Sequence, residues 1–207
     1  MPVPASRSLS AAALVSAALM TLAPPAVGQA PAVEAGPEAR VFTIAGGGFS
    51  LQAPATWERV EPKSGIVETE FAIPTEGTAA DGSPLPPGRM TVMGAGGSVE
   101  ANIDRWYGQF AQPDGAATKD KATTKKLDLA GCKVTLVDIP GTYKDSPGGP
   151  FAGGRTVERP DYRMLAAIVE TPDRGNYFLK FYGPAKTVAA HAAGFRTMVE
   201  GMVAAGK

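Results

Sequence analysis

The stretch "MTVMGAGGSVEANIDRWYGQF", residues 90–110, places a glycine-rich turn between a strand-like run and a helix-like run. A turn of this kind at the start of a helix can expose backbone N–H groups that bind a phosphate or another anion. The glycines are Gly94, Gly96 and Gly97, and Ser98 follows them. These four residues are the candidate anion-binding site.

The spacing of this loop matches neither nucleotide-binding motif. A dinucleotide fingerprint needs G-x-G-x-x-G within a parallel βαβ unit, but "GAGGSV" has Val99 in place of the third glycine. A P-loop needs a lysine after its last glycine, and none follows here. We therefore favour a structural role, in which some of the glycines adopt positive φ and Ser98 caps the helix. Anion binding stays the alternative.

Other residues with chemical potential are few. His191, the only histidine, lies between alanines and is interpreted as structural. Cys132, the only cysteine, forms no internal disulfide and is interpreted as a small hydrophobic strand residue. There is no Cys/His cluster for zinc, no G-x-S-x-G elbow, and Asp81 does not begin a calcium loop. The sequence predicts no catalytic residue, no metal and no cofactor, and hence no enzyme.

The charge balance excludes two classes of partner. The 20 lysines and arginines balance the 20 aspartates and glutamates, so the formal net charge is zero. A protein without net charge is not attracted to nucleic acid or to an anionic membrane by bulk electrostatics. Residues 1–28 have the form of a signal peptide, with Arg7, the apolar run "LSAAALVSAALMTLA", and small residues Ala26 and Gly28 before the cleavage point. An uncleaved anchor is the alternative. No other segment approaches the roughly 18 apolar residues of a membrane helix. We expect a periplasmic or secreted protein without a transmembrane segment after cleavage.

The rest of the chain divides into a linker and one domain. Residues 29–40 are rich in Ala and Pro and predict a disordered linker, and residues 41–207 predict a single domain. Runs with strand character recur along it, joined by hairpin turns such as "AGGG" and "PDRG". In "MLAAIV" both alternating faces are apolar, which indicates a central strand covered on both sides. The strand runs are "VFTI", "FSLQAP", "IVETEFAIP", "RMTVM", "TTKKLDL", "KVTLVDI", "YRMLAAIVET" and "NYFLKFYG".

Two segments have helical periodicity instead. Residues 98–111 place Val99, Ile103, Trp106 and Phe110 on one stripe, and a second helix opens at Gly183–Pro184. The apolar stripe of the second helix consists of Val188, Ala192, Phe195, Met198, Val199, Met202 and Val203. The predicted fold is α+β: a largely antiparallel sheet with helices on both faces, an α/β/α sandwich.

A Gly- and Pro-rich segment at about 145–161 predicts a mobile loop. Arginines and aromatic residues in a mobile loop favour partner recognition. A solvated insertion without a role is the alternative. The candidate partner-binding residues in and beside this loop are Phe151, Arg155, Arg159, Asp161 and Arg163.

Several stretches carry a family resemblance. "FSLQAPATWERV" and "YFLKFYGPAKTVAAHAAGFRTMVEGM" resemble the early strand and the closing strand and helix of the PsbP-like fold, that of an extrinsic photosystem II subunit. "VETEFAIP", "MTVMGAGGSVEANIDRWYGQF" and "DYRMLAAIVET" resemble an uncharacterised group of exported bacterial proteins of planctomycete type. The resemblance implies docking or assembly and no catalytic residue. The photosynthetic role does not transfer, because nothing here matches that subunit's docking residues.

Two functions of different class follow. The first is an exported, non-enzymatic domain that docks on an unidentified envelope or secreted protein. The second is a small-ligand or anion-binding protein, or an enzyme, that uses the loop from Gly94 to Ser98.

Overall fold

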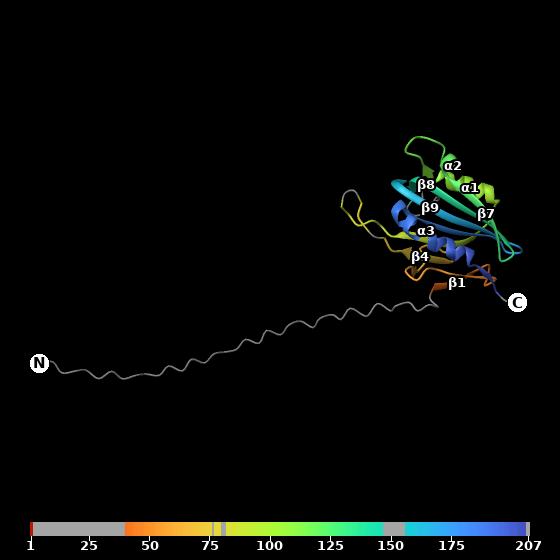
Figure 1. Ribbon diagram of the computed structural model, residues 1–207, viewed down its shortest axis with the longest axis horizontal. Coiled ribbons are helices and arrows are strands. Elements are labelled where there is room, and N and C mark those ends of the chain that lie inside the picture. The colour runs from red at the N-terminus through yellow and green to blue at the C-terminus, as the bar shows by residue number, and fades with distance from the viewer. Residues whose placement is uncertain (2–39, 76, 80–81, 147–155, 206–207) are drawn as a thin grey trace. The chain divides into compact units, whose positions relative to one another are not determined.

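The computed structural model describes residues 1, 40–75, 77–79, 82–146 and 156–205 (Figure 1). The predicted signal peptide at 1–28 and linker at 29–40 lie almost entirely outside these residues and stay predictions. Within the described part of the chain, no helix combines the length and the hydrophobicity needed to cross a membrane.

A large antiparallel sheet forms the centre of the domain. Its strands follow the order β3-β4-β5-β10-β9-β8-β6, and β7 also pairs with β8. Every described pair of neighbours is antiparallel, as predicted. The strands are β3 Glu58–Val60, β4 Thr69–Ile73, β5 Gly88–Ala95, β6 Phe110–Ala111, β7 Thr123–Leu129, β8 Cys132–Asp145, β9 Val157–Thr171 and β10 Gly175–Pro184.

A second, small sheet joins the two ends of the described domain. It consists of β1 Val41–Ile44, β2 Phe49–Gln52 and β11 Val203–Ala204 in the order β1-β2-β11. The pairing places Val203 opposite Ser50. The predicted helical stripe is therefore wrong at Val203, which is 58% exposed and belongs to a strand. The helix ends before it because Gly201 caps the last turn.

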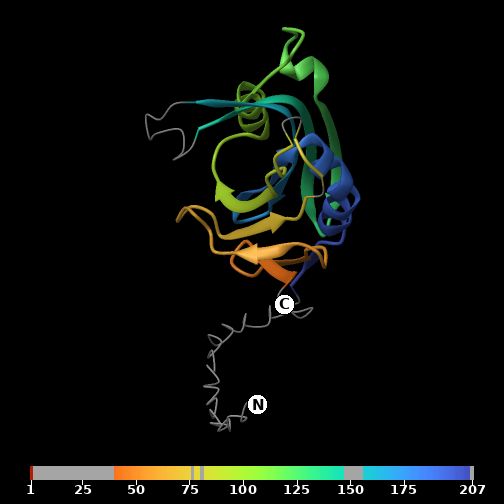
Figure 2. The same ribbon diagram turned by 90° about the vertical axis from the view of Figure 1, so that its left-hand side faces the viewer.

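Helices cover both faces of the large sheet, as predicted. They are α1 Val99–Gly108, the short α2 Thr118–Lys121, and α3 Ala185–Glu200. Figure 2 shows α1 and α3 on opposite sides of the strands, and the small sheet lies near α3. The alternation of β9 explains the two contact surfaces. Met164, Ala166 and Ile168 pack in the cluster under α1, whereas Leu165 and Val169 pack in the cluster under α3.

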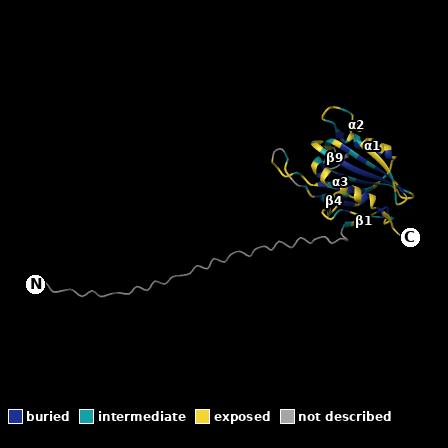
Figure 3. Cartoon of the chain, in the orientation of Figure 1, coloured by how far each residue is buried: buried dark blue, intermediate teal, exposed yellow. Residues whose placement is uncertain are grey.

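The central strands are buried on both faces, which the dark colour along β9 shows in Figure 3. This confirms the prediction for "MLAAIV". Trp57 is 3% exposed and packs against Phe71 and Phe181, with ring centroids 6.3 and 5.3 Å away. The turn at Ala130–Gly131 is also confirmed, because both residues have the positive φ of a tight hairpin turn, 50° and 80°.

Two predicted boundaries are wrong. The first helix ends at Gly108, so Phe110 reaches the core from β6 and not from the helix. It is still 3% exposed and packs in the same cluster as Trp106. The predicted loop at 145–161 is too long, because β8 extends to Asp145 and β9 begins at Val157. Pro160 of this segment lies within β9, next to a β-bulge, where a proline is tolerated in a strand.

Candidate functional site

The helix α1 covers only one end of its sheet face. Trp106 packs edge-on against Phe178 of β10, with ring centroids 5.4 Å apart. Beyond Phe178, the same face of β10 carries Lys180 and Tyr182, both partly exposed. Neighbouring strands extend this surface, which we call the tyrosine face. Its members are Arg89, Tyr143, Arg159, Tyr162, Lys180 and Tyr182.

The three tyrosines form one continuous aromatic surface. The ring of Tyr143 lies 5.2 Å from that of Tyr182 and stacks on Tyr162 at 6.1 Å with a 9° angle between planes. Phe110 supports Tyr143 from below at 5.3 Å. Burial raises the pKa of all three hydroxyls, so they stay neutral at physiological pH. Rings that are already packed lose little conformational entropy when a partner covers them.

An ion pair fixes Arg89 at one side of this surface. Its guanidinium donates to both carboxylate oxygens of Glu70, at 2.7 and 2.8 Å, and to the hydroxyl of Tyr182 at 2.7 Å. Glu70 is only 2% exposed. The hydrogen bonds from Arg89 lower the pKa of this carboxyl, so the pair stays ionised. Arg89 is therefore a pre-oriented cation, 34% exposed at its side chain.

Lys180 is the unusual member of the tyrosine face. Its Nζ donates to Oε1 of Gln109 at 3.1 Å and lies 5.5 and 5.8 Å from the rings of Trp106 and Tyr182. Among the described residues no carboxylate pairs with it. Burial and, to a smaller extent, the nearby charge of Arg89 lower the pKa of this amine to about 8. The cation is thus held by an amide oxygen and aromatic rings alone.

The outer ends of β8 and β9 extend the surface. Arg159 is the register partner of Tyr143 and forms an ion pair with Asp145, with Nη2 and Oδ2 3.2 Å apart. Between Gly141 and Tyr143 the register shifts, because β9 has one extra residue there. Asp161 lies at this bulge with φ 54°, the left-handed conformation that aspartate tolerates better than most residues.

The bulge separates the predicted partner-binding residues. Without it, Arg159 and Arg163 would lie on the same face of β9, because side chains alternate with a period of two. The extra residue places Arg163 on the opposite face, where it pairs with Asp138 at 2.6 Å. Arg159 lies on the tyrosine face, and Asp161 is exposed at the bulge. Phe151 and Arg155 lie outside the described residues.

The glycine loop has the contacts of a structural turn. Gly97 has φ 92°, as predicted for some of these glycines, and Ser98 accepts a hydrogen bond from the backbone N–H of Ala101 at 3.1 Å. The amide of Asn102, a buried residue, donates to the carbonyl oxygens of Gly96 and Ser98 at 3.1 and 2.9 Å. A Cβ at position 97 would lie 3.2 Å from this amide nitrogen.

The other two glycine-loop candidates serve the strand and the turn. Gly94 belongs to β5, where it pairs with Tyr177, and a Cβ there would lie 3.6 Å from a carboxylate oxygen of Glu68. Gly96 has open space around its Cα. The first turn of α1 also contains the acidic Glu100. A carboxylate at the start of a helix already occupies the favourable position for negative charge, and it would repel a second anion there. Whether the loop binds an anion stays a prediction.

His191 and Cys132 have structural surroundings, as predicted. Nδ1 of His191 accepts from the indole N–H of Trp57 at 3.2 Å, so Nε2 carries the proton and donates to the carbonyl oxygen of Pro74 at 3.0 Å. Cys132 is 2% exposed, and burial raises the pKa of its thiol. Within the described residues, no three His, Cys, Asp or Glu side chains gather as a metal site would require.

Sequence reasoning missed Arg89, Lys180, Tyr143 and Tyr182, and it noted Tyr162 only as an aromatic residue beside the loop. One signal was present, because "YFLKFYG" places Lys180 in an apolar strand expected to be covered. A lysine in such a strand needs a partner or a function. The other residues come from strands far apart in the sequence, so only the register brings them together.

Comparisons with known proteins give fold-level similarities. No protein-family model matches the chain, and no curated protein matches it. Among solved structures, cyanobacterial PsbP (CyanoP) from Synechocystis sp. PCC 6803 covers 80% of this chain and 91% of its own at 10% identity, with a TM-score of 0.45. PA94, a protein of unknown function from Pseudomonas aeruginosa, covers 81% and 97% at 11% identity, with a TM-score of 0.41.

One of these two structures is a PsbP protein, the class that the sequence resembles. At these TM-scores the similarity carries no conclusion about function. The α+β class with a large antiparallel sheet rests on the strands and register of this chain.

Proposed function

We propose that this chain is an exported, non-enzymatic domain that docks on an envelope or secreted protein through the tyrosine face. The observation that carries the proposal is the joint presence of three packed, partly exposed tyrosines and the cations Arg89, Arg159 and Lys180 on one surface. Tyrosine and arginine are enriched among the residues that dominate binding energy at protein interfaces.

The charges of this surface define the chemistry of the partner. Glu70 neutralises Arg89, and Asp145 neutralises Arg159, but no described carboxylate neutralises Lys180. A partner that presents an aromatic or apolar patch beside one acidic group would cover the rings and pair with this amine. Desolvation of a complementary ion pair at an interface favours the correct partner and penalises others.

Export is supported by the signal-peptide pattern of residues 1–28 and by the resemblance to exported bacterial proteins of planctomycete type. Absence of catalysis is supported by the buried thiol of Cys132 and by the two hydrogen bonds of His191. The alternative, an anion site at Gly94–Ser98, has no described contact in its favour, because Ser98 and Asn102 are engaged in capping the helix and holding the loop.

A pull-down of the mature protein from native envelope extract tests the proposal. Tyr162→Ala and Arg159→Ala each remove one partly exposed side chain of the tyrosine face. Tyr107→Ala on α1 and Lys126→Ala on β7 are the controls, because they remove a tyrosine and a cationic side chain that are not members of the tyrosine face. We expect the captured partner to fall about tenfold or more with the first pair and to persist with the controls.

Melting curves and circular dichroism of all four variants establish that they are folded. Equal capture by folded Tyr162→Ala, folded Arg159→Ala and the wild type would contradict the proposal. An equal loss with the control variants would also contradict it, since the effect would then not depend on this face.

A further inference from the structure

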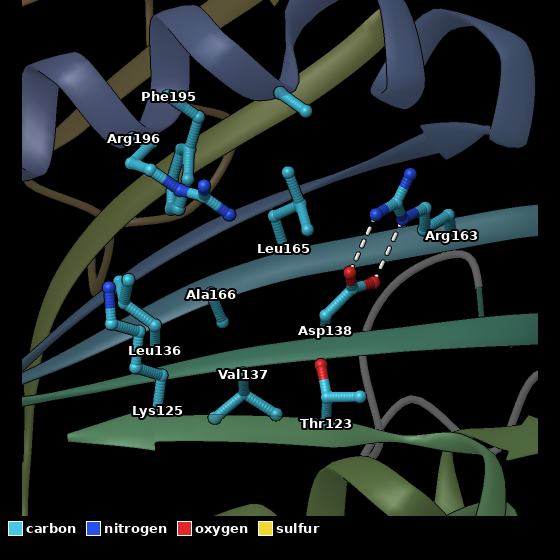
Figure 4. Close-up of a pocket in the computed structure, with 11 residues that line it drawn as sticks. Thr123, Lys125, Leu136, Val137, Asp138, Arg163, Leu165, Ala166, Phe195 and Arg196 are labelled. Carbon is cyan, nitrogen blue, oxygen red and sulfur yellow. Dashed lines mark hydrogen bonds and ion pairs between the residues drawn. The ribbon is translucent and has the colours of Figure 1, made fainter.

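A cavity lies on the opposite side of the sheet from the tyrosine face. It has a volume of about 100 Å³ and opens between α3 and the strands β7, β8 and β9 (Figure 4). Its apolar lining comes from both layers, with Leu136 and Leu165 from the strands and Ala192 and Phe195 from the helix. None of the residues assigned above to partner binding on the tyrosine face lines it.

The charged lining of this cavity is strongly unbalanced. At one end Arg163 donates to both carboxylate oxygens of Asp138, at 2.8 and 2.6 Å, and this pair is neutral as a unit. Figure 4 shows the pair beside Leu165. The hydrogen bonds that Arg163 donates to Asp138 raise the pKa of its guanidinium, so Arg163 remains charged and paired. It is therefore not the group that a ligand would neutralise.

The other two charged residues are both cations, and both lack partners. Lys125 stands on β7, and Arg196 stands on α3. In Figure 4 the guanidinium of Arg196 extends from the helix over the sheet, and Lys125 rises from the strand on the other side of the opening. Among the described residues neither side chain forms a hydrogen bond or an ion pair. Two cations without a described anionic partner thus lie beside the apolar lining of the cavity, which we call its apolar floor.

We infer that this cavity binds a small organic carboxylate with a short unbranched apolar tail, which Lys125 and Arg196 hold by its anionic end. The apolar floor disfavours a hydrated inorganic anion, because such an ion would gain nothing from Leu136, Leu165 and Phe195. A cavity of about 150 Å³ accommodates benzene, so this smaller one holds a tail of about four or five carbons. The carboxylate then lies at the opening, where both cations reach it. This inference does not depend on the proposed docking function.

Calorimetric titration of the full mature chain tests the inference. The probes are hexanoate, its neutral counterpart hexanamide, and inorganic phosphate, at constant pH and ionic strength. We expect saturable binding of hexanoate, at least tenfold weaker binding of hexanamide, and no binding of phosphate in the same concentration range. The tenfold difference is about what loss of one charge-assisted hydrogen bond produces.

Two charge variants and one control locate the site. Arg196→Gln and Lys125→Gln should each weaken hexanoate binding about tenfold. Lys126→Gln is the matched control, because this adjacent lysine of β7 points to the opposite face of the sheet and should bind hexanoate like the wild type. Ala192→Leu fills the cavity and keeps both cations, and it should abolish binding.

Several outcomes would overturn the inference. Equal affinity for hexanoate and hexanamide would show that the cations do not act on the ligand. Phosphate binding as tight as hexanoate would show that the apolar floor plays no part. Absence of saturable hexanoate binding by folded wild type, or unchanged binding by Ala192→Leu, would show that the cavity is not the site.

Discussion

The two faces of the large sheet are built from the same strands, but the helices α1 and α3 bury them to different extents. On the face under α3, β10 contributes Leu179 and Phe181, both fully buried beneath a 16-residue helix. On the face under α1, β10 contributes the buried Phe178 and then Lys180 and Tyr182. The helix α1 has only 10 residues, and the polar residues begin where its cover ends. Helix length therefore decides how much of a face becomes core and how much stays available for binding.

The largest expected effect comes from removing one buried aromatic side chain from the core under each helix. Trp106→Ala under α1 and Phe195→Ala under α3 each delete a side chain that is 3% exposed. Each should lower the free energy of unfolding by about 3–5 kcal/mol, because a large aromatic side chain leaves a cavity behind. Urea unfolding curves measure the loss. A change below about 1 kcal/mol for Trp106→Ala would show that α1 does not cover a true core.

A smaller effect is expected at the uncovered end of the α1 face. Glu70→Gln keeps the shape of the side chain but leaves Arg89 without its carboxylate. We expect a loss of about 2 kcal/mol at neutral pH, less than for a fully buried pair because Arg89 is 34% exposed. Asp114→Asn, which breaks the exposed pair with Lys121, should change stability little and serves as control.

The same pair predicts a difference in acid. Arg89 lowers the pKa of Glu70 in the folded state, so the carboxylate stabilises the protein above its ordinary pKa of 4.5. This contribution is lost as the pH falls through the lowered pKa. Wild-type stability should therefore approach that of Glu70→Gln in acid. A constant difference between the two proteins from pH 7 to the acid limit would contradict the assignment.

Lys180 gives a pH dependence of the same direction at alkaline pH, because its pKa is also lowered in the folded state. Its folded pKa is about 8, below the ordinary value of 10.5, so between these values the unfolded chain retains a proton that the folded chain has released. Stability should rise by about 1–2 kcal/mol from pH 8 to 9.5. Above about pH 10 it should fall, because the unfolded tyrosines ionise before the three buried ones.

Lys180→Met keeps the apolar length of the side chain and removes the titrating amine. Chemical unfolding at pH 7.5, 8.5 and 9.5 should show the rise for wild type and for Lys126→Met, and no rise for Lys180→Met. If Lys180→Met retains the slope, the amine is not the titrating group.

The smallest expected effects concern the start of α1, which sets how far this helix covers its face. Gly97→Ala strains a residue with φ 92° and should cost on the order of 1 kcal/mol or more. Ser98→Ala removes the cap on Ala101 and should cost ~1 kcal/mol. Unfolding curves are to be paired with phosphate and nucleotide titrations of the wild type. Micromolar phosphate binding that is lost in Gly97→Ala at unchanged stability would favour the anion site instead.

Local patterns were enough to predict most of the fold. Period-two alternation identified the strands, and turn chemistry identified hairpins such as Ala130–Gly131. The end of α1 was not predictable in this way, because Phe110 continues the helical spacing of Trp106 although it lies in β6. Both assignments bury the same side chain in the same cluster. The apolar pattern therefore fixed burial but not backbone conformation.

The candidate site was much less predictable. A single bulge residue decides whether Arg159 and Arg163 share a face, and neither composition nor periodicity reveals it. The tyrosine face combines β5, β8, β9 and β10, whose pairing is a property of the whole chain. Lys180 alone had a local signal, as a lysine within an apolar strand.

The pairing of Val203 with Ser50 controls when folding can finish. Contacts between residues so far apart in sequence form late, because the chain loses loop-closure entropy before the contact stabilises it. During synthesis at about 5–20 residues per second, β2 lacks its second neighbour until residue 203 has been made. For the exported chain proposed above, this delay would keep the small sheet incomplete during translation and leave the polypeptide available for translocation before it closes.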